Sequence, residues 1–357
     1  MSSAEKVFIV LALAVLILAS VDIAKAQGRL IAPNGQIIVH TGVIDLDDLT
    51  IEQKVAQMIV VSGQNYNREA WQKLGVGGIH MFARGSAREF TSDIESFQEG
   101  RAVPFFVSSD LEGCLNPLGA FYQSTPLSSI LSPGQAFEKG VTDGRELASL
   151  GFTLNFAPVV DLSDSIWGCR VFPGSVEDKE ILAQSYILGL QNEGIVATAK
   201  HYPGQALSVH DPHKYVVEAT ITQDDVAPYS YLFSKGDVKA VMVTHVVGSG
   251  VVNSHGVPSV VDPEVISGIR SHFDGLIVTD EVMMLGLRSF YPTTEEMYVA
   301  VFLAGSDVVL NFNEDPYEIE KMISVVSSAV RSGKISITRI DASVGRILRA
   351  KGFTVAE

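Results

Sequence analysis

The sequence lacks the short motifs that mark nucleotide-binding and serine hydrolase sites. Its 31 glycines form no G-x-x-x-x-G-K-S/T segment and no G-x-G-x-x-G segment after a strand, so nucleotide binding has no support. A G-x-S-x-G nucleophile elbow is also missing, and serine hydrolase chemistry therefore has nothing to rest on. Any catalysis must come from other residue types.

Positive charge is scarce. The chain has 26 Lys and Arg against 41 Asp and Glu, which gives a formal net charge of −15. Nucleic acid and anionic membrane surfaces would repel such a protein, so neither is expected as a partner. Charged residues make up 19% and hydrophobic residues 46% of the 357 residues, which is typical of a globular enzyme with a sizeable core.

Long apolar runs are few, and the first lies near the amino terminus. Lys6 precedes a nearly unbroken apolar run over residues 7–21, and Ala24-Lys25-Ala26 supplies small residues after it. This layout predicts a secretory signal peptide at residues 1–26 and a secreted or periplasmic mature chain of residues 27–357. The alternative, an uncleaved anchor, needs about 20 apolar residues. No second run is long enough to cross a membrane, so stable membrane insertion is not expected after cleavage.

Cysteine is almost absent, because Cys114 and Cys169 are the only two in the sequence. In an oxidising compartment two thiols can pair. Sequence alone does not place their Cα atoms within bonding distance. Two unpaired small hydrophobic side chains therefore remain an equal alternative.

From residue 55 onward, short apolar runs alternate with longer amphipathic stretches. Continuous apolar character is typical of strands buried on both faces of a parallel sheet. Strands that alternate with helices predict an α/β fold, and eight of them fit a (β/α)8 TIM barrel of parallel strands, which needs roughly 250 residues. An open doubly wound sheet is the alternative. The predicted strands are Val55–Val61, Gly77–Ala83, Pro104–Asp110, Leu154–Asp161, Ala197–Pro203, Val238–Val247, Gly275–Val282 and Asp307–Asn313.

Four amphipathic stretches predict long helices. In the second of them, Ile181, Leu182, Ser185, Leu188 and Gly189 are expected to form the buried stripe. The four predicted helices are Ser132–Leu150, Ser175–Glu193, Asp315–Arg331 and Ser336–Ala350.

Titratable residues gather at the ends of the predicted strands. The carboxyl ends of barrel strands carry the active site, and a purely structural protein has no need for such groups at so many strand ends. We therefore expect an enzyme. The residues are Asp110 and Glu112 at the third run, Asp161 at the fourth, His201 at the fifth, His245 at the sixth, and Asp280 and Glu281 at the seventh.

Asp280 and Glu281 follow directly on an apolar run. Because side chains alternate along a strand, the two should point in different directions, so that one can face the barrel axis. A carboxylate in that position can attack an electrophilic carbon or stabilise an oxocarbenium ion. Alternatively, Asp280 caps the next helix, which is an ordinary role for Asp after a strand.

Residues 200–213 carry Lys200, three histidines and Asp211. Asp211 can orient the imidazole of His213 and raise its basicity, and such a pair can give a proton to a leaving group and later take one from water. A zinc site formed by His201, His210 and His213 has less support, because the spacing is not H-E-x-x-H and no Cys joins it. A solvated loop is the remaining alternative.

Four segments carry a family resemblance. Lys200-His-Tyr-Pro-Gly204 is similar to a K-H-F/Y-P-G signature, Asn155-Phe-Ala-Pro-Val-Val-Asp161 to N-F-A-P-V-x-D, and Ser109-Asp-Leu-Glu-Gly113 to a D-x-E-G loop. Phe273–Asp280 resembles a strand that ends in a catalytic aspartate. In their order along the chain, these segments resemble glycoside hydrolase family 3, particularly its single-domain β-N-acetylhexosaminidase branch. The likeness extends from about Ile51 to Lys351.

The resemblance implies a retaining β-N-acetylhexosaminidase that releases terminal N-acetylglucosamine from peptidoglycan or chitin-type glycans. A β-glucosidase of the same family and a glycan-binding relative without turnover are the alternatives. Neither a cofactor nor a metal is implied. The implied roles are Asp280 as nucleophile, Asp211 and His213 as the acid/base pair, and Asp110, Arg170, Lys200 and His201 as ligands of the first sugar's hydroxyls.

Three departures from the family pattern stand near these residues. The usual D-x-E-G-G-R loop is Glu112-Gly-Cys-Leu-Asn-Pro-Leu118 here, K-H-F-P-G-H-G ends in Gln205-Ala206, and Asp-Ser-His becomes Asp211-Pro-His213. Nothing equivalent replaces the planar donor of the missing arginine. Our hypothesis is that a disulfide between Cys114 and Cys169 braces the subsite instead. The exact sugar, the aglycone, the acceptor (water or phosphate) and the oligomeric state stay open.

Overall fold

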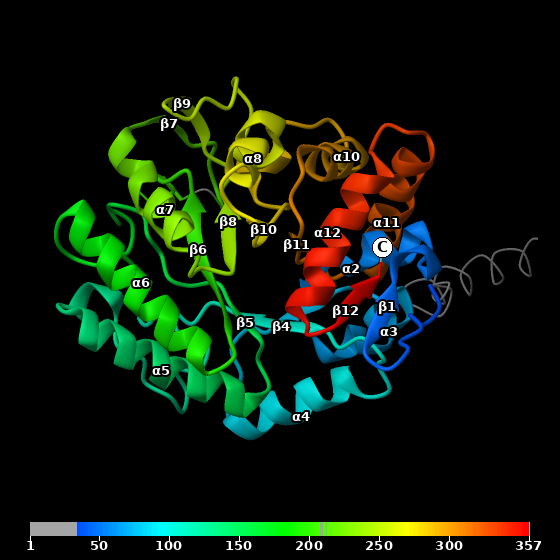
Figure 1. Cartoon of the computed structure of the whole chain (residues 1–357), viewed down its shortest axis with the longest axis horizontal. Helices are drawn as coiled ribbons and strands as arrows, with labels where there is room; N and C mark the ends of the chain where they lie inside the picture. Colours follow the sequence, from blue (N-terminus) through cyan, green and yellow to red (C-terminus); the bar gives the residue numbers. More distant parts are fainter. Residues whose placement is uncertain (1–33, 208–209, 212, 357) are drawn as a thin grey trace, which may run out of the picture.

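The computed structural model describes residues 34–207, 210–211 and 213–356. The predicted signal peptide lies outside the described residues. Eight parallel strands form one sheet in the order β10-β8-β6-β5-β4-β3-β2-β11. A parallel bridge between Val278 and Val308 joins its two ends, so the sheet curls into a nearly closed barrel with helices around it (Figure 1). The predicted (β/α)8 barrel is confirmed.

Each predicted apolar run contains one barrel strand. The first was too long, because Ile51–Gln57 forms helix α2, which a capping box between Thr50 and Gln53 begins. Only the last part of Val55–Val61 is therefore strand. The barrel strands are β2 Ile59–Ser62, β3 Gly78–His80, β4 Phe106–Ser109, β5 Leu154–Asn155, β6 Val196–Tyr202, β8 Ala240–Val243, β10 Leu276–Thr279 and β11 Val309–Asn311.

Each of the four predicted long helices begins one residue after the first residue of its predicted range. Ser132, Ser175 and Asp315 each accept a backbone N–H in the first turn, which satisfies donors that the helix itself leaves free. The remaining helices begin at similar caps or short turns. The helices are α3 Arg68–Leu74, α4 Ala87–Gln98, α5 Pro133–Leu150, α6 Val176–Asn192, α7 Gln223–Lys235, α8 Pro263–Arg270, α9 Leu285–Arg288, α10 Thr294–Ala304, α11 Pro316–Arg331 and α12 Ile337–Ala350.

The predicted buried stripe of α6 was partly wrong. Ile181 and Leu188 are 42% and 40% exposed, whereas the neighbouring positions Tyr186 and Ile187 are buried. Gly189 was placed correctly, because a Cβ there would lie 2.2 Å from a backbone oxygen of α5. Because α5 packs this closely, the buried face of α6 is rotated by about one residue position from the face that the apolar pattern predicted.

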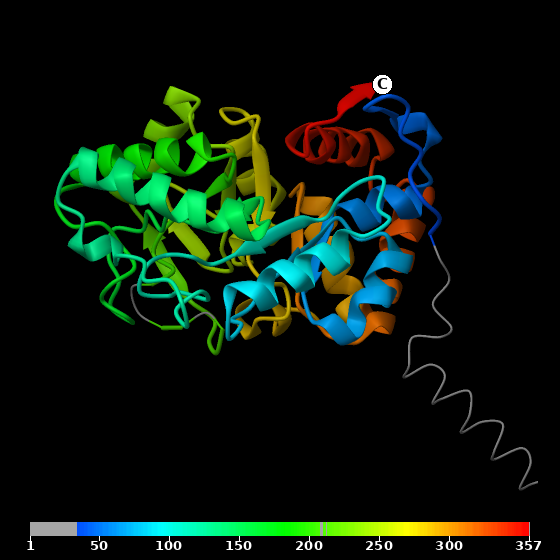
Figure 2. The ribbon, with the colours of Figure 1, turned by 90° about the horizontal axis from the view of Figure 1, so that it is seen from below.

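Two small parallel sheets tie distant segments together. Strand β1 (Val43–Asp45) pairs with β12 (Thr354–Ala356), so the first described strand lies beside the last one (Figures 1 and 2). Strand β7 (Glu218–Ile221) pairs with β9 (Val247–Gly250) and joins the connections that follow β6 and β8. None of the helices within the described ranges combines the length and the apolar character that a membrane crossing requires.

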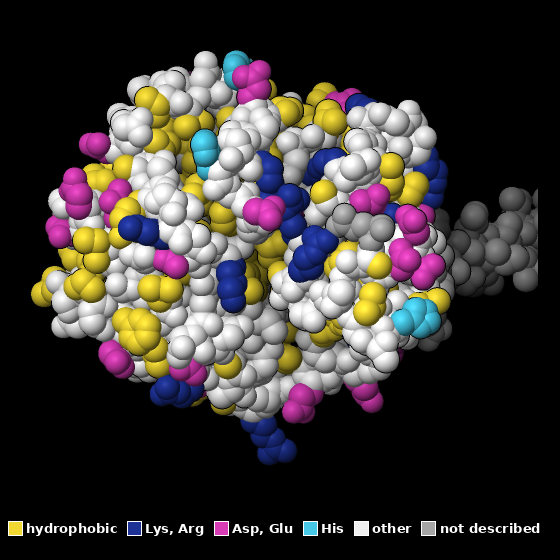
Figure 3. Space-filling view, in the orientation of Figure 1, with side chains coloured by type: hydrophobic (Ala, Val, Ile, Leu, Met, Phe, Trp, Pro, Cys, Tyr) yellow, Lys and Arg dark blue, Asp and Glu magenta, His cyan; other side chains and the backbone are white. Residues whose placement is uncertain are grey.

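The face crossed by α12 carries Lys and Arg side chains around its centre, while most acidic side chains lie toward its edges (Figure 3). At the amino ends of the strands, the fully buried Asp307 pairs with Arg270 and Arg346 and accepts a hydrogen bond from Ser343 Oγ at 2.7 Å. Burial of a carboxylate requires such partners. Charge at this end of the barrel therefore serves the packing of α8 and α12.

Candidate active site

A pocket of about 320 Å³ lies at the carboxyl ends of the barrel strands. Six of the seven predicted catalytic and sugar-binding residues line it, and Asp211 stands behind His213. Loops that follow different strands therefore converge on one cavity, as expected for a barrel enzyme. The lining residues are Phe82, Asp110, Glu112, Leu115, Phe156, Trp167, Arg170, Lys200, His201, Ala206, Leu207, His213, Met242, Asp280, Glu281, Leu310 and Phe312.

Two acids and two bases form a network on one wall of the pocket. Lys200 Nζ lies 2.6 Å from Asp110 Oδ1 and 2.5 Å from Glu112 Oε1. Arg170 donates to both oxygens of Glu112, from Nε at 2.6 Å and from Nη2 at 2.9 Å. The sequence interpretation gave Glu112 no role in binding, although its place in the D-x-E-G segment beside Asp110 was a usable signal.

All four groups of this network keep their charges at neutral pH. Burial raises the pKa of Asp110, but Lys200 and His80 outweigh it and bring the pKa to about 2. Burial also raises the pKa of Glu112, and Lys200 and Arg170 reverse that effect. The pKa values of Lys200 and Arg170 rise, because their acidic neighbours outweigh burial. The network is neutral as a whole and offers charged donors and acceptors to a polar, uncharged ligand.

His80 lies beneath Asp110 and was missed in the sequence. Its Nε2 is 3.4 Å from Asp110 Oδ2, and its Nδ1 is 3.1 Å from Ser108 Oγ. Burial lowers the pKa of His80 to about 4, so the ring is neutral and acts as a hydrogen-bonding support. Its ring stacks on Phe156 and Phe312. The only sequence signal was a histidine within the predicted apolar run Gly77–Ala83.

His201 is oriented by a buried acid. Its Nδ1 lies 2.8 Å from Asp161 Oδ2, and both side chains are buried. A histidine held in this way keeps one tautomer and one ring orientation. Asp161, which ends the fourth predicted strand, therefore positions a pocket residue and does not line the pocket itself.

Asp280 follows β10 and lines the pocket. Its backbone N–H donates to Val243 O, and its Oδ1 accepts the N–H of Glu281 at 2.9 Å. The helix-capping alternative is wrong, because the next helix begins at Leu285 with Met284 as its N-cap. Burial raises the pKa of Asp280, but His245, His201 and His213 together lower it below its usual range. Asp280 is therefore an ionised carboxylate within the pocket.

Glu281 lines the same pocket as Asp280, and both residues follow the end of β10 at Thr279. Glu281 Oε1 accepts the N–H of Phe312 at 3.1 Å. Burial raises the pKa of Glu281 to about 7. Its carbonyl oxygen lies 2.8 Å from Nε2 of the buried His245, and burial lowers the pKa of that histidine. His245 therefore stands as a neutral group behind Asp280.

Asp211 and His213 form the predicted pair. His213 Nδ1 lies 2.7 Å from Asp211 Oδ1, and the same oxygen accepts the backbone N–H of His213 at 3.0 Å. Burial raises the pKa of Asp211, and the hydrogen bonds from His213 lower it further than burial raises it. The imidazole is 61% exposed and lines the same pocket as Asp280. One cavity therefore combines an ionised carboxylate with a carboxylate-oriented imidazole.

The zinc interpretation gains no support from this geometry. Residues 34–207, 210–211 and 213–356 contain no group of three or more His, Cys, Asp or Glu side chains placed to hold a metal ion. His201 and His213 instead each face an aspartate of their own.

Cys114 and Cys169 form a disulfide, with their Cα atoms 6.2 Å apart. It joins the loop that carries Glu112 to the loop that carries Arg170. The covalent link and the two hydrogen bonds between Arg170 and Glu112 therefore hold the same two loops together.

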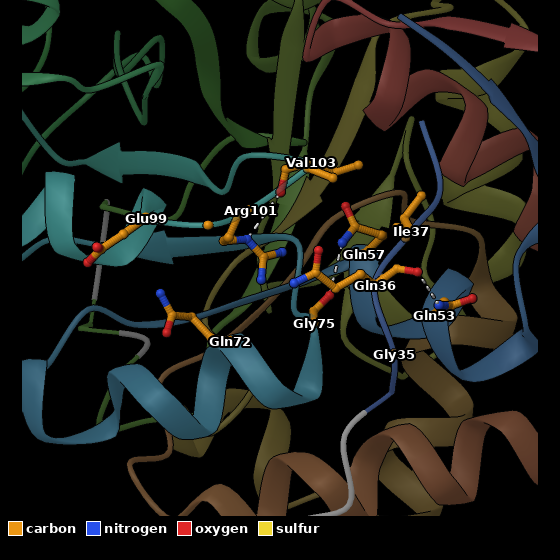
Figure 4. A pocket seen from close by; sticks show the side chains of 12 residues that line it. Gly35, Gln36, Ile37, Gln53, Gln57, Gln72, Gly75, Glu99, Arg101 and Val103 are labelled. Carbon is orange, nitrogen blue, oxygen red and sulfur yellow. Dashed lines mark hydrogen bonds between the residues drawn. The ribbon is translucent and has the colours of Figure 1, made fainter. Parts of the chain in front are cut away.

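A second cavity, of about 220 Å³, opens near the amino ends of the strands (Figure 4). Its lining includes four glutamines, and Glu99 and Arg101 are the only ionisable side chains among its lining residues. It therefore lacks the two facing acids, or the acid and imidazole, that hydrolysis of a glycosidic bond requires. Of these two cavities, only the pocket that contains Asp280 has such groups.

Residues 50–350 match the family model described as the glycosyl hydrolase family 3 N terminal domain. A β-N-acetylglucosaminidase/β-glucosidase of Cellulomonas fimi is 27% identical over 342 residues, which cover 86% of this chain and 58% of that protein. The β-hexosaminidase LpqI of Mycobacterium tuberculosis is 26% identical, and the match covers 85% of this chain and 83% of the relative.

The solved structure of a glycoside hydrolase family 3 β-N-acetylglucosaminidase from Paenibacillus sp. str. FPU-7 superposes with a TM-score of 0.77 at 28% identity. The match covers 85% of this chain and 62% of that one. The chain thus spans less than two thirds of the Cellulomonas and Paenibacillus proteins and most of the mycobacterial one.

Proposed function

The chain belongs to glycosyl hydrolase family 3, and on this premise we propose that it is a retaining β-N-acetylhexosaminidase. The observation that carries the proposal is the single pocket that Asp280 shares with His213, which is paired with Asp211. The names of the relatives, β-hexosaminidase and β-N-acetylglucosaminidase, support the same substrate class.

In the first step, a carboxylate oxygen of Asp280 bonds to the anomeric carbon while the glycosidic C–O bond breaks. His213 gives a proton to the departing oxygen. In the second step, water attacks the glycosyl-enzyme bond, His213 takes the proton of that water, and Asp280 leaves as a carboxylate. The two inversions return the sugar with its original anomeric configuration.

The first sugar is bound by the polar wall of the pocket. We infer that Asp110, Lys200, Arg170 and His201 hydrogen-bond its hydroxyl groups, and that Glu112 holds Lys200 and Arg170 in place. A neutral network of ionised groups suits an uncharged sugar, because each charge is already compensated before the sugar binds.

Two rival functions remain testable. A β-glucosidase would use the same Asp280 without a pocket for an acetamido group, and the name of the Cellulomonas relative includes both activities. A glycan-binding protein without turnover would retain the sugar contacts alone. The presence of both the carboxylate and the Asp–His pair favours turnover.

Export is part of the proposal. We infer that residues 1–26 direct secretion and are removed, because a charged start, an apolar run and Ala24-Lys25-Ala26 follow one another. Peptidoglycan fragments or chitin-type glycans would then be the substrates that the enzyme meets.

The test is hydrolysis of 4-nitrophenyl N-acetyl-β-glucosaminide compared with 4-nitrophenyl β-glucoside. We expect a clear preference for the acetamido substrate. Asp280→Asn should lower kcat on the order of 10³-fold or more, because an amide is a poor nucleophile. Asp274→Asn is the matched control, since the side chain of Asp274 is 94% exposed and pairs with Arg346 outside the pocket. A preference for glucoside would favour the β-glucosidase, and no hydrolysis of either would favour the binding protein.

A further inference from the structure

We propose that Trp167 forms a second sugar-binding site, at which the ring on the leaving-group side of the cleaved bond stacks on the indole. The inference deepens the proposed function and rests on it. It assigns the substrate class as a disaccharide or longer glycan, or a glycoside with an aromatic aglycone.

Trp167 is an exposed aromatic residue at the edge of the catalytic pocket. It lines the pocket and is 38% exposed. The guanidinium carbon of Arg170 lies 4.6 Å from the indole centroid, so Arg170 covers one face of the ring. We infer that the exposed part of the residue includes the opposite face of the ring. An uncovered indole face is the surface on which the C–H face of a sugar packs well.

The loop around Trp167 is built to hold this ring in one position. The carboxylate of Asp164 accepts the backbone N–H groups of Trp167 at 2.8 Å, of Cys169 at 3.0 Å and of Arg170 at 2.9 Å. The disulfide from Cys169 to Cys114 adds a covalent link to the neighbouring loop. A platform that is already fixed loses little conformational entropy when a ligand binds.

The depth of the pocket residues indicates which ring Trp167 meets. Lys200 and Glu112 are 3% and 0% exposed, so the polar network binds the sugar that enters most deeply. Trp167 and His213 lie at the exposed mouth of the same pocket, at 38% and 61%. His213 protonates the leaving oxygen in the proposed reaction. A ring near that proton donor and outside the polar network is the ring that leaves.

Two substrates separate the outer ring from the inner one. N,N′-diacetylchitobiose occupies both positions, whereas N-acetyl-β-glucosaminyl fluoride has no outer ring and a leaving group that needs little proton donation. We expect Trp167→Ala to lower kcat/KM on the disaccharide about 3- to 10-fold, the range for a lost aromatic contact, and to leave the fluoride within twofold. Trp167→Phe should restore most of the loss. The control is Phe137→Ala, because Phe137 is also 38% exposed but lies on α5, away from the pocket. This variant should leave kcat/KM unchanged on both substrates.

Binding without turnover keeps the two proposals distinguishable. In an Asp280→Asn background, calorimetry should show that Trp167→Ala weakens binding of the disaccharide about 3- to 10-fold and leaves binding of N-acetylglucosamine unchanged. Equal losses of affinity for both ligands, or no loss for either, would overturn the proposed stacking on Trp167, whatever the kinetics show. Disaccharide binding that depends on Trp167, in a parent protein that hydrolyses neither substrate, would reject the proposed activity and keep the platform.

Discussion

At the scale of single residues, the proposed proton transfer depends on His213. It is the exposed imidazole of the pocket, and Asp211 fixes its Nδ1 at 2.7 Å. That bond leaves Nε2 as the nitrogen that can serve a substrate. Asp280, by contrast, is an ionised carboxylate, because its surroundings lower its pKa below the usual range. The two groups therefore have separate tasks.

We expect His213→Ala to lower kcat on the disaccharide about 10²- to 10⁴-fold, the usual contribution of a general acid. With a 2,4-dinitrophenyl glycoside the loss of the glycosylation rate should be much smaller, because that leaving group departs without a proton. Single-turnover kinetics on both substrates would measure it. Asp211→Asn should show the same ordering with smaller losses, and equal losses on both substrates would rule out acid catalysis by His213.

The raised pKa of Glu281 gives a prediction for stability. The carboxyl has a pKa of about 7 in the folded protein and an ordinary value of 4.5. Between these values the unfolded chain has lost the proton and the folded chain still holds it, so stability falls as pH rises.

Urea unfolding at pH 5 and pH 8 would measure this effect. Glu281→Gln should lose less stability than the parent over that interval, by at most about 3 kcal/mol. Its amide oxygen can still accept the N–H of Phe312. The exposed Glu138 of α5 supplies the control variant Glu138→Gln. Parallel pH dependence of parent and Glu281→Gln would contradict the shift.

The sequence predicted most of the titratable residues that line the pocket, but not all of the residues that hold them in position. Asp110, Lys200 and Asp280 were predicted from the rule that strand ends meet at one face of a barrel. Glu112 and His80 were not given roles, because their contacts come from different strands. No spacing along the chain shows that Lys200 from β6 reaches an acid in the loop after β4. The departures near Glu112 also drew attention to the missing arginine and away from the acid.

At the scale of elements, the apolar runs were sufficient to locate the eight strands, and the amphipathic stretches were sufficient to locate the four long helices. Helix α2 was missed because Val55 and Ala56 near its end are apolar and lie only a few residues before β2. The buried face of α6 was displaced because apolar residues occupy three sides of that helix. The close contact with α5, through Gly140 and Gly189, helps to select the buried side.

The disulfide acts at this scale, because it joins two active-site loops. We expect the double variant Cys114→Ser, Cys169→Ser to raise KM severalfold with a smaller change in kcat, since Arg170 and Glu112 lose a constraint on their loops. The disulfide closes a loop of 55 residues. Its removal should also lower the free energy of unfolding by about 2 to 4 kcal/mol. Kinetics and urea unfolding measure the two effects.

Treatment of the parent with a reductant provides the matched comparison. The reduced parent and the double serine variant should agree in KM and in stability. An unchanged KM in both would mean that the hydrogen bonds between Arg170 and Glu112 position the loops without covalent help.

At the scale of the whole molecule, the charged groups at the two ends of the barrel differ in their roles. Those at the amino end hold helices together, whereas those at the carboxyl end line the pocket. The buried Asp307, with Arg270 and Arg346, joins helices at the amino end. The carboxyl end holds Asp280, His213 and the neutral charged network in one pocket. The length and the alternating pattern predicted this barrel, but they carry no information on which sugar fills it, since that depends on loop contacts.

The most direct test of the account is to trap the covalent intermediate. The protein would be incubated with a 5-fluoro derivative of N-acetyl-β-glucosaminyl fluoride, digested, and its labelled peptide sequenced by mass spectrometry. The account predicts one glycosyl adduct, on the carboxylate of Asp280, and none in Asp280→Asn. An adduct on Glu281, Asp110 or any other residue would contradict it.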